Sequence, residues 1–553
     1  MYFIIFFFGF LFSEIDVSFS YELKYGNGKQ VTIQDTSDYN YIENLLDVNT
    51  SFGNNMYLYT QLEYSDPPVF GDRNNKLNQI ISNFFLEYEN DRLSLTLGDL
   101  NDLYGRGLTY YSMIDQNVDY SNLLRGVSIN YFLKDNLKLS GLYGQNELDF
   151  RSNPSFRKSD QSIFTSANIL SLDYENDILG FINYNYLKQK LFIDPSTFNL
   201  IGKTDLHDDF NSRLNLDSSG FLASVLLSSI SNTEYVKDTI FVNNHNLNWN
   251  FYIGNFDVYI DKAWIDYQKI YGDNVFGSRF YSSIYTDIAD IGVTYEYKNY
   301  NTPYLVKTLA NPPIVYREGS SILASRNAHA FNFGNEVGHQ IDFNKNVNGV
   351  NLVANFSISR RHKEEDVPKY NFVDFISIEE DSTLSLYDPF RQIYFETNGW
   401  LFSEKLYFKL ASDYFIELLD QKHTSAITFP TQWVLKRNSG NSFTMYFELQ
   451  NKIVKQFDQS FIVTSEKKYF SQYLSISFNR LGKWIVTGFF DQEIIKDEAE
   501  KWLGVDFSYN INEKTQFSLF YGSQKGGLVC ANGICAEQPG FEDGFKVTLR
   551  SIF

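Results

Sequence analysis

Apolar and polar residues alternate along most of this chain with a period of two. Between residues 246 and 253, Leu247, Trp249 and Phe251 share one face of an extended strand, and asparagines occupy positions between them. The same alternation recurs at residues 351–359, 443–450 and 473–479. The polar positions are mostly Asn, Ser, Thr, Gln and Tyr, which suit contact with water. The pattern predicts many β-strands, each with one apolar and one polar face.

The connections between these predicted strands are of two kinds. Short turns rich in Asn, Asp, Gly and Ser, which favour tight reversals, occur at residues 89–91, 134–136, 175–177, 217–220, 438–440, 480–482 and 510–512. Long polar connections occur at residues 65–73, 104–121, 145–158, 301–326, 362–389 and 523–544. A transmembrane β-barrel sorts its connections in this way, with short periplasmic turns and long extracellular loops, whereas a β-sandwich has no reason to do so.

We therefore predict an all-β fold, a closed antiparallel transmembrane β-barrel of about 24–26 strands, with about 26 as the preferred number. An even number of strands places both chain ends in the periplasm. Strands begin close to Ser20, so we expect no separate plug domain. No later segment has the ~18 uninterrupted apolar residues of a transmembrane helix.

The C-terminal strand gives the orientation of the predicted barrel. One of its faces is apolar, formed by Phe545, Val547, Leu549 and Phe553, and the other carries Lys546, Thr548 and Arg550. This pattern is typical of a strand with one face in lipid and one in a polar lumen. The strand descends to the periplasm, so the 523–544 and 362–389 connections are predicted to be extracellular.

The N-terminus predicts export. Residues 1–12 are almost entirely large and apolar, which fits the hydrophobic region of a secretory signal peptide and is too short for a spanning helix. Small residues at Ser18 and Ser20 place the predicted cleavage after Ser20. No Lys or Arg precedes the apolar run, a departure from the usual signal. We expect a signal peptide at residues 1–20, a barrel at residues 21–553 and a location in the outer membrane.

The composition and the net charge limit the classes of partner that this chain can bind. Phe (51) and Tyr (40) are abundant, which favours strands and suits the aromatic girdles of a membrane barrel. The mean hydropathy of −0.30 agrees with alternation between lipid-facing and lumen-facing residues. The net charge of −20 argues against nucleic-acid binding, which needs a basic surface. Outer-membrane lipid is the expected surrounding.

Two cysteines, Cys530 and Cys535, flank an Asn-Gly turn pair in the segment Cys-Ala-Asn-Gly-Ile-Cys. The turn folds the segment back, and the predicted oxidising location favours a disulfide between them. Half of a metal site is the alternative, but no His or second Cys pair lies nearby. A thioredoxin-like redox motif has a two-residue spacing, and this pair has four residues between its members.

A charged, glycine-containing stretch at residues 98–108 is the most distinctive internal segment. Gly105 and Gly107 allow a bend or bulge at a strand end. The two arginines here can pair with nearby aspartates, which gives a candidate lumen charge cluster of Asp99, Asp102, Arg106, Asp115, Asp119 and Arg125. The cluster belongs either to a folded-in loop that narrows the lumen and recognises a ligand, or to a structural group of salt bridges in the interior.

Enzyme signals are weak. The six histidines include no pair at zinc-helix spacing, and the chain has no Gly-x-Ser-x-Gly elbow or phosphate-binding Gly-Lys-Ser/Thr loop. We expect no catalytic, cofactor-binding or metal-binding residues, and no enzymatic activity.

The 98–108 stretch, the Cys530–Cys535 hairpin and the terminal strand together resemble an uncharacterised family of large single-chain outer-membrane β-barrels of Gram-negative bacteria. The resemblance extends over essentially the whole mature chain. It implies the fold and the location, and it brings no established functional residues. The terminal strand also resembles the signal recognised by barrel-insertion machinery, which implies that role for Phe545, Val547, Leu549 and Phe553.

Two functions from different classes remain. The first is a porin-like or ligand-selective transport channel for small solutes, because a barrel of this size encloses a wide polar lumen that must be filled or used. The second is a non-conducting scaffold for surface proteins, with its lumen occluded by inward loops and its aromatic, acidic loops as contact surfaces.

Overall fold

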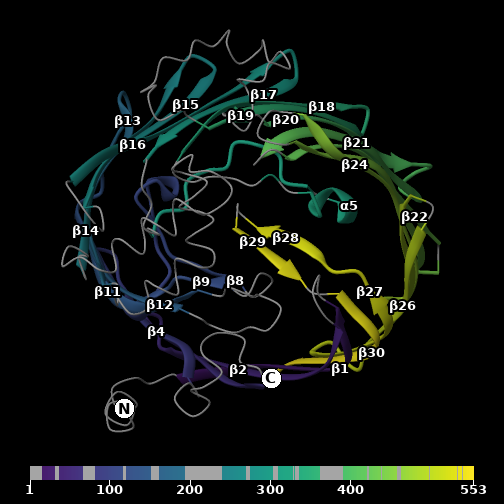
Figure 1. Cartoon of the computed structure of the whole chain (residues 1–553). Coiled ribbons are helices and arrows are strands. Elements are labelled where there is room, and N and C mark those ends of the chain that lie inside the picture. Colours follow the sequence, from purple (N-terminus) through teal and green to yellow (C-terminus); the bar gives the residue numbers. More distant parts are fainter. Residues whose placement is uncertain are drawn as a thin grey trace, which may run out of the picture.

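A single antiparallel sheet closes on itself to form a barrel (Figure 1). The computed structural model describes residues 15–31, 36–66, 81–115, 120–150, 161–192, 239–268, 274–302, 309–319, 321–327, 329, 335–361, 390–419, 422–437, 439–457, 462–496, 498–531, 534–538 and 540–553. The first and last wall strands pair over most of their length, so the wall has no free edge. The predicted closed all-β barrel is confirmed.

The wall contains 24 strands, each paired with its neighbours in sequence. They are β1 (Ile15–Val31), β2 (Thr36–Phe52), β3 (Met56–Asp66), β4 (Ile81–Glu89), β5 (Leu93–Leu100), β10 (Leu124–Lys134), β11 (Leu137–Phe150), β12 (Gln161–Asn176), β13 (Gly180–Phe192), β14 (Thr239–Ile253), β15 (Phe256–Gln268), β16 (Asn274–Ile288), β17 (Ile291–Asn301), β18 (Asn335–Val347), β19 (Val350–Arg360), β20 (Phe390–Leu401), β21 (Leu406–Leu419), β22 (Lys422–Lys436), β23 (Asn441–Phe457), β24 (Val463–Arg480), β25 (Trp484–Ile495), β26 (Glu498–Asn510), β27 (Thr515–Gln524) and β30 (Gly540–Ile552).

The strand number lies at the lower end of the predicted range. The ambiguous turns at residues 21–55 and 239–292 left the predicted number open, and the structure has β1 and β2 in the first of these ranges and β14, β15, β16 and the start of β17 in the second. The predicted short turn at residues 217–220 lies outside the described residues. That turn falls in the connection between β13 and β14, and these two strands pair directly with each other from Phe181–Asn250 to Phe192–Thr239. Direct pairing leaves no place in the wall for further strands between them.

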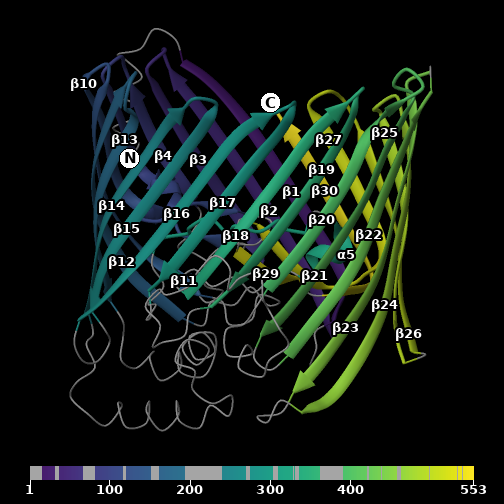
Figure 2. The ribbon, with the colours of Figure 1, turned by 90° about the horizontal axis from the view of Figure 1, so that it is seen from above.

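The two rims of the barrel differ in their connections. At one rim, which we call the short-turn rim, every connection between wall strands has two to four residues, as at residues 135–136 and 402–405. All the long connections predicted from the sequence leave from the other rim, which we call the long-loop rim. The tilt of the strands between the two rims is visible from the side (Figure 2). Both ends of the described chain lie at the short-turn rim, where Phe553 N donates to Phe19 O at 2.8 Å.

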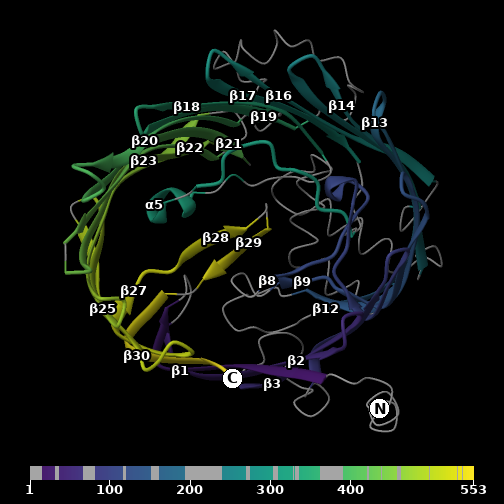
Figure 3. The same ribbon diagram turned by 180° about the vertical axis from the view of Figure 1, so that it is seen from behind.

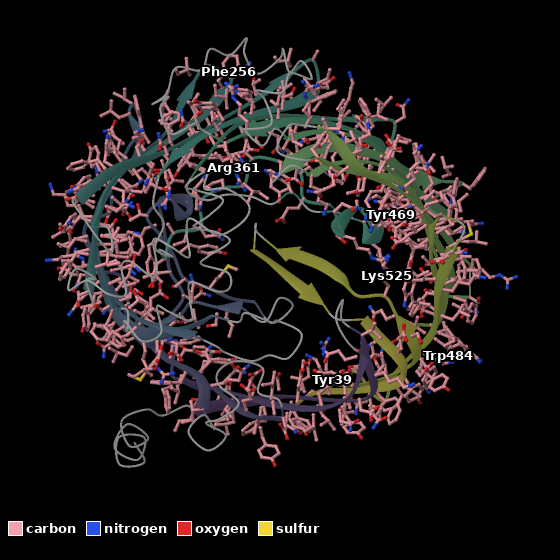
Figure 4. The ribbon with its side chains drawn as sticks, in the orientation of Figure 1. Tyr39, Phe256, Arg361, Tyr469, Trp484 and Lys525 are labelled. Carbon is pink, nitrogen blue, oxygen red and sulfur yellow. The ribbon has the colours of Figure 1, made fainter. Side chains whose placement is uncertain are left out.

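The two faces of the wall differ in chemistry, as the alternation predicts. Large apolar side chains are exposed on the outer face, among them Leu170, Leu352 and Leu503. Their neighbours along each strand point inward and are largely polar, such as the fully buried Asn185 and Asn246. Side chains line both sides of the ring (Figure 4). In the part of the chain that the structure describes, no helix is long and apolar enough to cross a membrane.

Candidate functional site in the lumen

Three segments fold from the long-loop rim into the lumen, and the reverse view shows the same arrangement (Figures 1 and 3). The first inward segment, residues 101–123, carries β6 (Leu103–Tyr104), the 3-10 turn η2 (Gly105–Gly107), β7 (Tyr110–Tyr111), β8 (Ile114–Asp115) and β9 (Tyr120–Ser121). The second inward segment, within residues 309–329, carries helix α5 (Ile322–Ser325). The third is a hairpin of β28 (Gly527–Ala531) and β29 (Ile534–Gln538).

The Gly-Arg-Gly sequence explains how the first inward segment turns. Gly105 and Gly107 adopt positive φ angles of 59° and 85°, which glycine tolerates without strain. A Cβ on Gly105 would lie 2.5 Å from the side-chain oxygen of Asn246, and one on Gly107 would lie 2.2 Å from the carbonyl oxygen of Asn311. Gly105 therefore packs on the wall, and Gly107 packs on the second inward segment.

Arg106, between these glycines, reaches the inner wall. Its guanidinium lies 3.9 Å from the ring centroid of Tyr259 and donates to the Tyr281 hydroxyl at 3.3 Å. Its backbone has a φ of 41°, which is uncommon for a residue with a side chain. The cation–π contact and the hydrogen bond hold the turn against β15 and β16.

Leu108, which follows Gly107, is anchored by its carbonyl group. Leu108 O accepts hydrogen bonds from Arg279 Nη1 at 3.0 Å and Asn244 Nδ2 at 3.3 Å. The Leu108 side chain is buried in a cluster with Tyr259, Tyr281, Tyr300 and Val315. The segment is thus a packed part of the interior, with its own core against the wall.

The second inward segment pairs with the first and with the wall. Tyr111 N donates to Leu309 O at 2.7 Å, and Asn311 N donates to Gly107 O at 3.0 Å. Tyr300 of β17 donates its hydroxyl hydrogen to Pro313 O at 2.8 Å. These contacts join the two segments into one layer across part of the lumen.

Helix α5 is held by a carboxylate from the wall. The two oxygens of Glu448 accept from Ile322 N at 2.7 Å and Leu323 N at 2.9 Å, the backbone groups that a helix N-terminus leaves unpaired. Just after the helix, Arg326 pairs with Asp491 at 2.5 Å. Asn327 donates to Gln450 at 3.0 Å. Strands β23 and β25 therefore fix both ends of α5.

A buried charge network holds the end of this segment. Lys298 Nζ lies 2.5 Å from Glu336 Oε1, and both side chains are almost fully buried. Lys298 also donates to the carbonyl of Ile314. His329 contacts Glu336 at 3.1 Å and Glu417 at 2.6 Å, and its ring stacks on Phe390 with centroids 4.1 Å apart.

The His329 ring is positively charged at neutral pH in this network. Burial by itself lowers the pKa of His329, but the Glu336 and Glu417 carboxylates outweigh it and raise the pKa from 6.5 to about 9. A raised histidine pKa contributes stability that is complete below the unfolded value of 6.5 and is lost as the pH rises through about 9.

We expect alkaline pH to loosen the second inward segment. As the pH rises through about 9, His329 loses its proton and both carboxylates lose a positive partner. Limited proteolysis of the detergent-solubilised barrel across this range should show faster cleavage within residues 309–329. His329→Gln should remove the pH dependence, and a wild-type cleavage rate that is flat across this range would contradict the expectation.

The structure separates the residues of the candidate charge cluster. Arg125 binds Asp99 with two hydrogen bonds, at 2.7 and 3.1 Å. Their strand neighbours Leu124 and Leu100 lie in a buried cluster with Tyr110 and Leu309 of the inward segments. Because side chains alternate along a strand, the Asp99–Arg125 pair lies on the outer face of the wall and not in the lumen.

Arg106 and Asp102 of the predicted cluster make contacts of their own. Arg106 contacts Tyr259 and Tyr281, as described above. Asp102 lies in the first inward segment, where Asp102 N donates to Ser112 Oγ at 3.1 Å. The backbone of Asp115 pairs with Tyr120, but its side chain and the whole of Asp119 lie outside the described residues. The two arginines thus contact different parts of the wall.

The hairpin places Cys530 directly opposite Cys535 in its register. Directly opposed residues of an antiparallel pair have Cα atoms about 4.5–5.5 Å apart, within the range that a disulfide spans. The positions of the two sulfur atoms lie outside the described part of the structure. The disulfide therefore stays a prediction, and its hairpin lies inside the barrel.

The sequence pattern does not reveal the second inward segment, because residues 301–326 fit the pattern of a long polar connection. A signal was present in the run Pro312-Pro313-Ile314-Val315-Tyr316, which is apolar and unlike a solvated loop. Val315 and Tyr316 are almost fully buried. Among the residues that the structure describes, no group of three or more His, Cys, Asp or Glu is arranged to hold a metal ion.

Residues 7–224 match the model of a family of unknown function, DUF6029. The match agrees with the predicted resemblance to an uncharacterised family of large barrels. It covers under half of the chain, including the 98–108 stretch but not the Cys530–Cys535 hairpin or the terminal strand. No curated protein matches the chain.

Among solved structures, the chain is similar to the siderophore receptor PirA from Pseudomonas aeruginosa, with 6% identity, a TM-score of 0.43, and 97% of this chain and 80% of that one covered. It is also similar to the copper transporter OprC, with 10% identity, a TM-score of 0.41, and coverage of 98% and 81%. For the translocation pore of the P pilus usher PapC, the identity is 9%, the TM-score 0.37, and the coverage 97% and 99%.

Proposed function

We propose that this protein is an integral outer-membrane channel for small polar solutes, with a lumen narrowed by its inward segments. The observation that carries the proposal is a 24-stranded ring with a polar inner face, in which the inward segments are docked by polar and charged contacts. A barrel of more than about 20 strands leaves a lumen that must be filled or used. The inward segments fill part of it.

The outer face supports a membrane location. It carries exposed apolar side chains on strands all around the ring, for example Leu170, Phe395 and Leu503. An exposed apolar band on a closed barrel is what lipid requires, since closure pairs the backbone groups of every strand. The short-turn rim then faces the periplasm, and the inward segments enter from the extracellular side.

Export through a signal peptide ending at Ser20 is part of the same proposal. Strand β1 begins at Ile15, five residues before the end of that peptide, and residues 15–19 pair with β2. Cleavage after Ser20 would shorten β1 at the short-turn rim while retaining its pairing with β30 from Tyr21 onward. Mass spectrometry of the mature protein identifies its N-terminal residue. It therefore distinguishes cleavage after Ser20 from cleavage at a position nearer the start of the chain.

The charges of the lumen favour cations. Several inner-face carboxylates accept hydrogen bonds from neutral side chains, as Asp47 does from Tyr59 and Gln61 at 2.9 Å each. Inner-face lysines such as Lys138 and Lys409 pair with carboxylates at 2.6 and 3.0 Å, so their charge is balanced locally. With a net charge of −20 on the whole chain, the field in the lumen attracts cations.

We expect the purified protein to form channels with a small conductance and a preference for potassium over chloride. Planar bilayer recordings measure the conductance, and the reversal potential in a potassium chloride gradient measures the preference. A reversal potential of the anion-selective sign would contradict the electrostatic argument. A folded barrel with no conductance above that of the bare membrane would refute the channel and favour a non-conducting scaffold for surface proteins.

A further inference from the structure

A row of aromatic rings crosses the inner wall between β23 and β30. Successive ring centroids lie 6.2 Å apart for Tyr446 and Tyr473, 6.1 Å for Tyr473 and Phe489, 5.8 Å for Phe489 and Phe520, and 6.3 Å for Phe520 and Phe541. The Phe489 and Phe520 rings are nearly parallel, with an interplanar angle of 9°. We call these five residues the aromatic row.

The aromatic row faces the lumen. Glu448 and Asp491 contact the second inward segment, so both point inward. Tyr446 and Phe489 lie two residues from them on the same strands and share that face. Across the sheet, Phe489 pairs with Gly504, Gly504 with Gly522, and Phe520 lies two residues from Gly522. Phe520 therefore faces inward as well.

Gly504 allows the two central rings of the aromatic row, Phe489 and Phe520, to lie next to each other. Phe489 and Phe520 come from β25 and β27, and β26 lies between them with Gly504 at the crossing point. A Cβ on Gly504 would lie 2.5 Å from Phe489 Cζ and 2.7 Å from Phe520 Cε2. The two rings meet over this glycine because no side chain separates them. Phe541 likewise lies over Gly544, whose added Cβ would be 2.4 Å from Phe541 Cζ.

Four rings of the aromatic row have accessible surface, whereas Phe541 is only 4% exposed, and the row has polar neighbours. Tyr446, Tyr473, Phe489 and Phe520 are each only partly buried. Ser518, on the strand of Phe520, hydrogen-bonds Ser508 of the neighbouring strand β26 at 2.9 Å. Lys546 Nζ lies 4.4 Å from the Phe541 centroid and 3.3 Å from Gln524 Oε1. Apolar faces with a few hydrogen-bonding groups at their border are typical of ligand sites.

We propose that the aromatic row binds linear, uncharged oligosaccharides on their way through the lumen. A pyranose ring has one face of C–H groups that packs on an aromatic ring, and its rim of hydroxyl groups needs hydrogen-bonding partners such as those beside the row. The nearly constant spacing of the rings is comparable to the length of one sugar unit in a linear chain. This inference rests on the proposed channel function and names its substrate class.

The test is titration calorimetry of the purified protein in detergent with maltohexaose, which needs no conduction. We expect wild-type protein to bind the hexasaccharide, and Phe489→Leu combined with Phe520→Leu to weaken binding at least tenfold. Phe490→Leu is the matched control, because Phe490 is the next residue on the same strand and points to the outer face. Its affinity should equal that of the wild type.

Folding of each variant is checked by the heat-dependent shift of the barrel on electrophoresis. No heat of binding to wild type, or equal affinity in the double variant, would overturn the inference. Binding of a flat aromatic probe such as p-nitrophenol, without binding of maltohexaose, would overturn the substrate class. A barrel that conducts ions but binds no sugar would refute only the sugar-binding inference. Sugar binding without conductance would refute the channel function and leave the sugar site supported.

Discussion

Replacing Glu336 by alanine is expected to release the second inward segment and to raise the single-channel conductance several-fold. Glu336 and Lys298 are paired at 2.5 Å with side chains 2% and 0% exposed, and Lys298 also holds the carbonyl of Ile314. Removing the carboxylate leaves the ammonium group and His329 buried without their shared partner. Breaking one side of a buried pair costs about 3–5 kcal/mol, enough to favour undocking of a segment while the wall stays closed.

The control for this prediction removes both charges. In Lys298→Met with Glu336→Met, no ammonium or carboxylate of the pair is left buried alone, so the conductance should return towards the wild-type value. Faster proteolysis within residues 309–329 should accompany the larger conductance of Glu336→Ala. If Glu336→Ala shows wild-type conductance and wild-type proteolysis, the segment is not held by this network.

Replacing Phe553 by aspartate is expected to reduce the amount of inserted barrel in cells by at least tenfold, with little effect on the stability of protein refolded in detergent. The Phe553 side chain is 63% exposed, so it contributes little packing to the wall. If the terminal aromatic residue is an insertion signal, its loss should act on assembly and not on the folded state.

Two further variants serve as controls for the effect of Phe553→Asp on insertion. Phe553→Leu retains an apolar terminus and should show an intermediate level of insertion. Ile511→Asp places the same charge at another exposed apolar position, 53% exposed, in a turn of the same rim. It should insert normally. Normal amounts of heat-modifiable barrel from Phe553→Asp would show that Phe553 is not a signal.

The sequence predicts the wall well because the information there is local. Each strand shows its own alternation, and the short turns contain residues that favour tight reversals, such as Gly482 in the turn at residues 481–483. The strand number was harder to predict, because the turns at residues 21–55 and 239–292 are ambiguous in sequence.

The interior could not be predicted in the same way, because its contacts join residues far apart in the chain. Glu448 accepts hydrogen bonds from Ile322 and Leu323, which lie more than a hundred residues away in sequence. The sequence around these residues does not indicate this contact. The grouping of Arg106 with Arg125 failed for a related reason. Proximity in sequence suggested one cluster, but one residue lies on a turn in the lumen and the other on the outer face of β10. The glycines at 105 and 107 were a correct signal of an unusual backbone, without information on what it packs against.

The pairing of β1 with β30 couples assembly of the barrel to completion of its synthesis. Strand β1 gains its second partner only when β30 is in place, so the sheet keeps an open edge until then. A chain broken off anywhere before Gly540 would lack the strand that seals the ring. Because the ring closes through β1 and β30, a free sheet edge would mark an incomplete barrel.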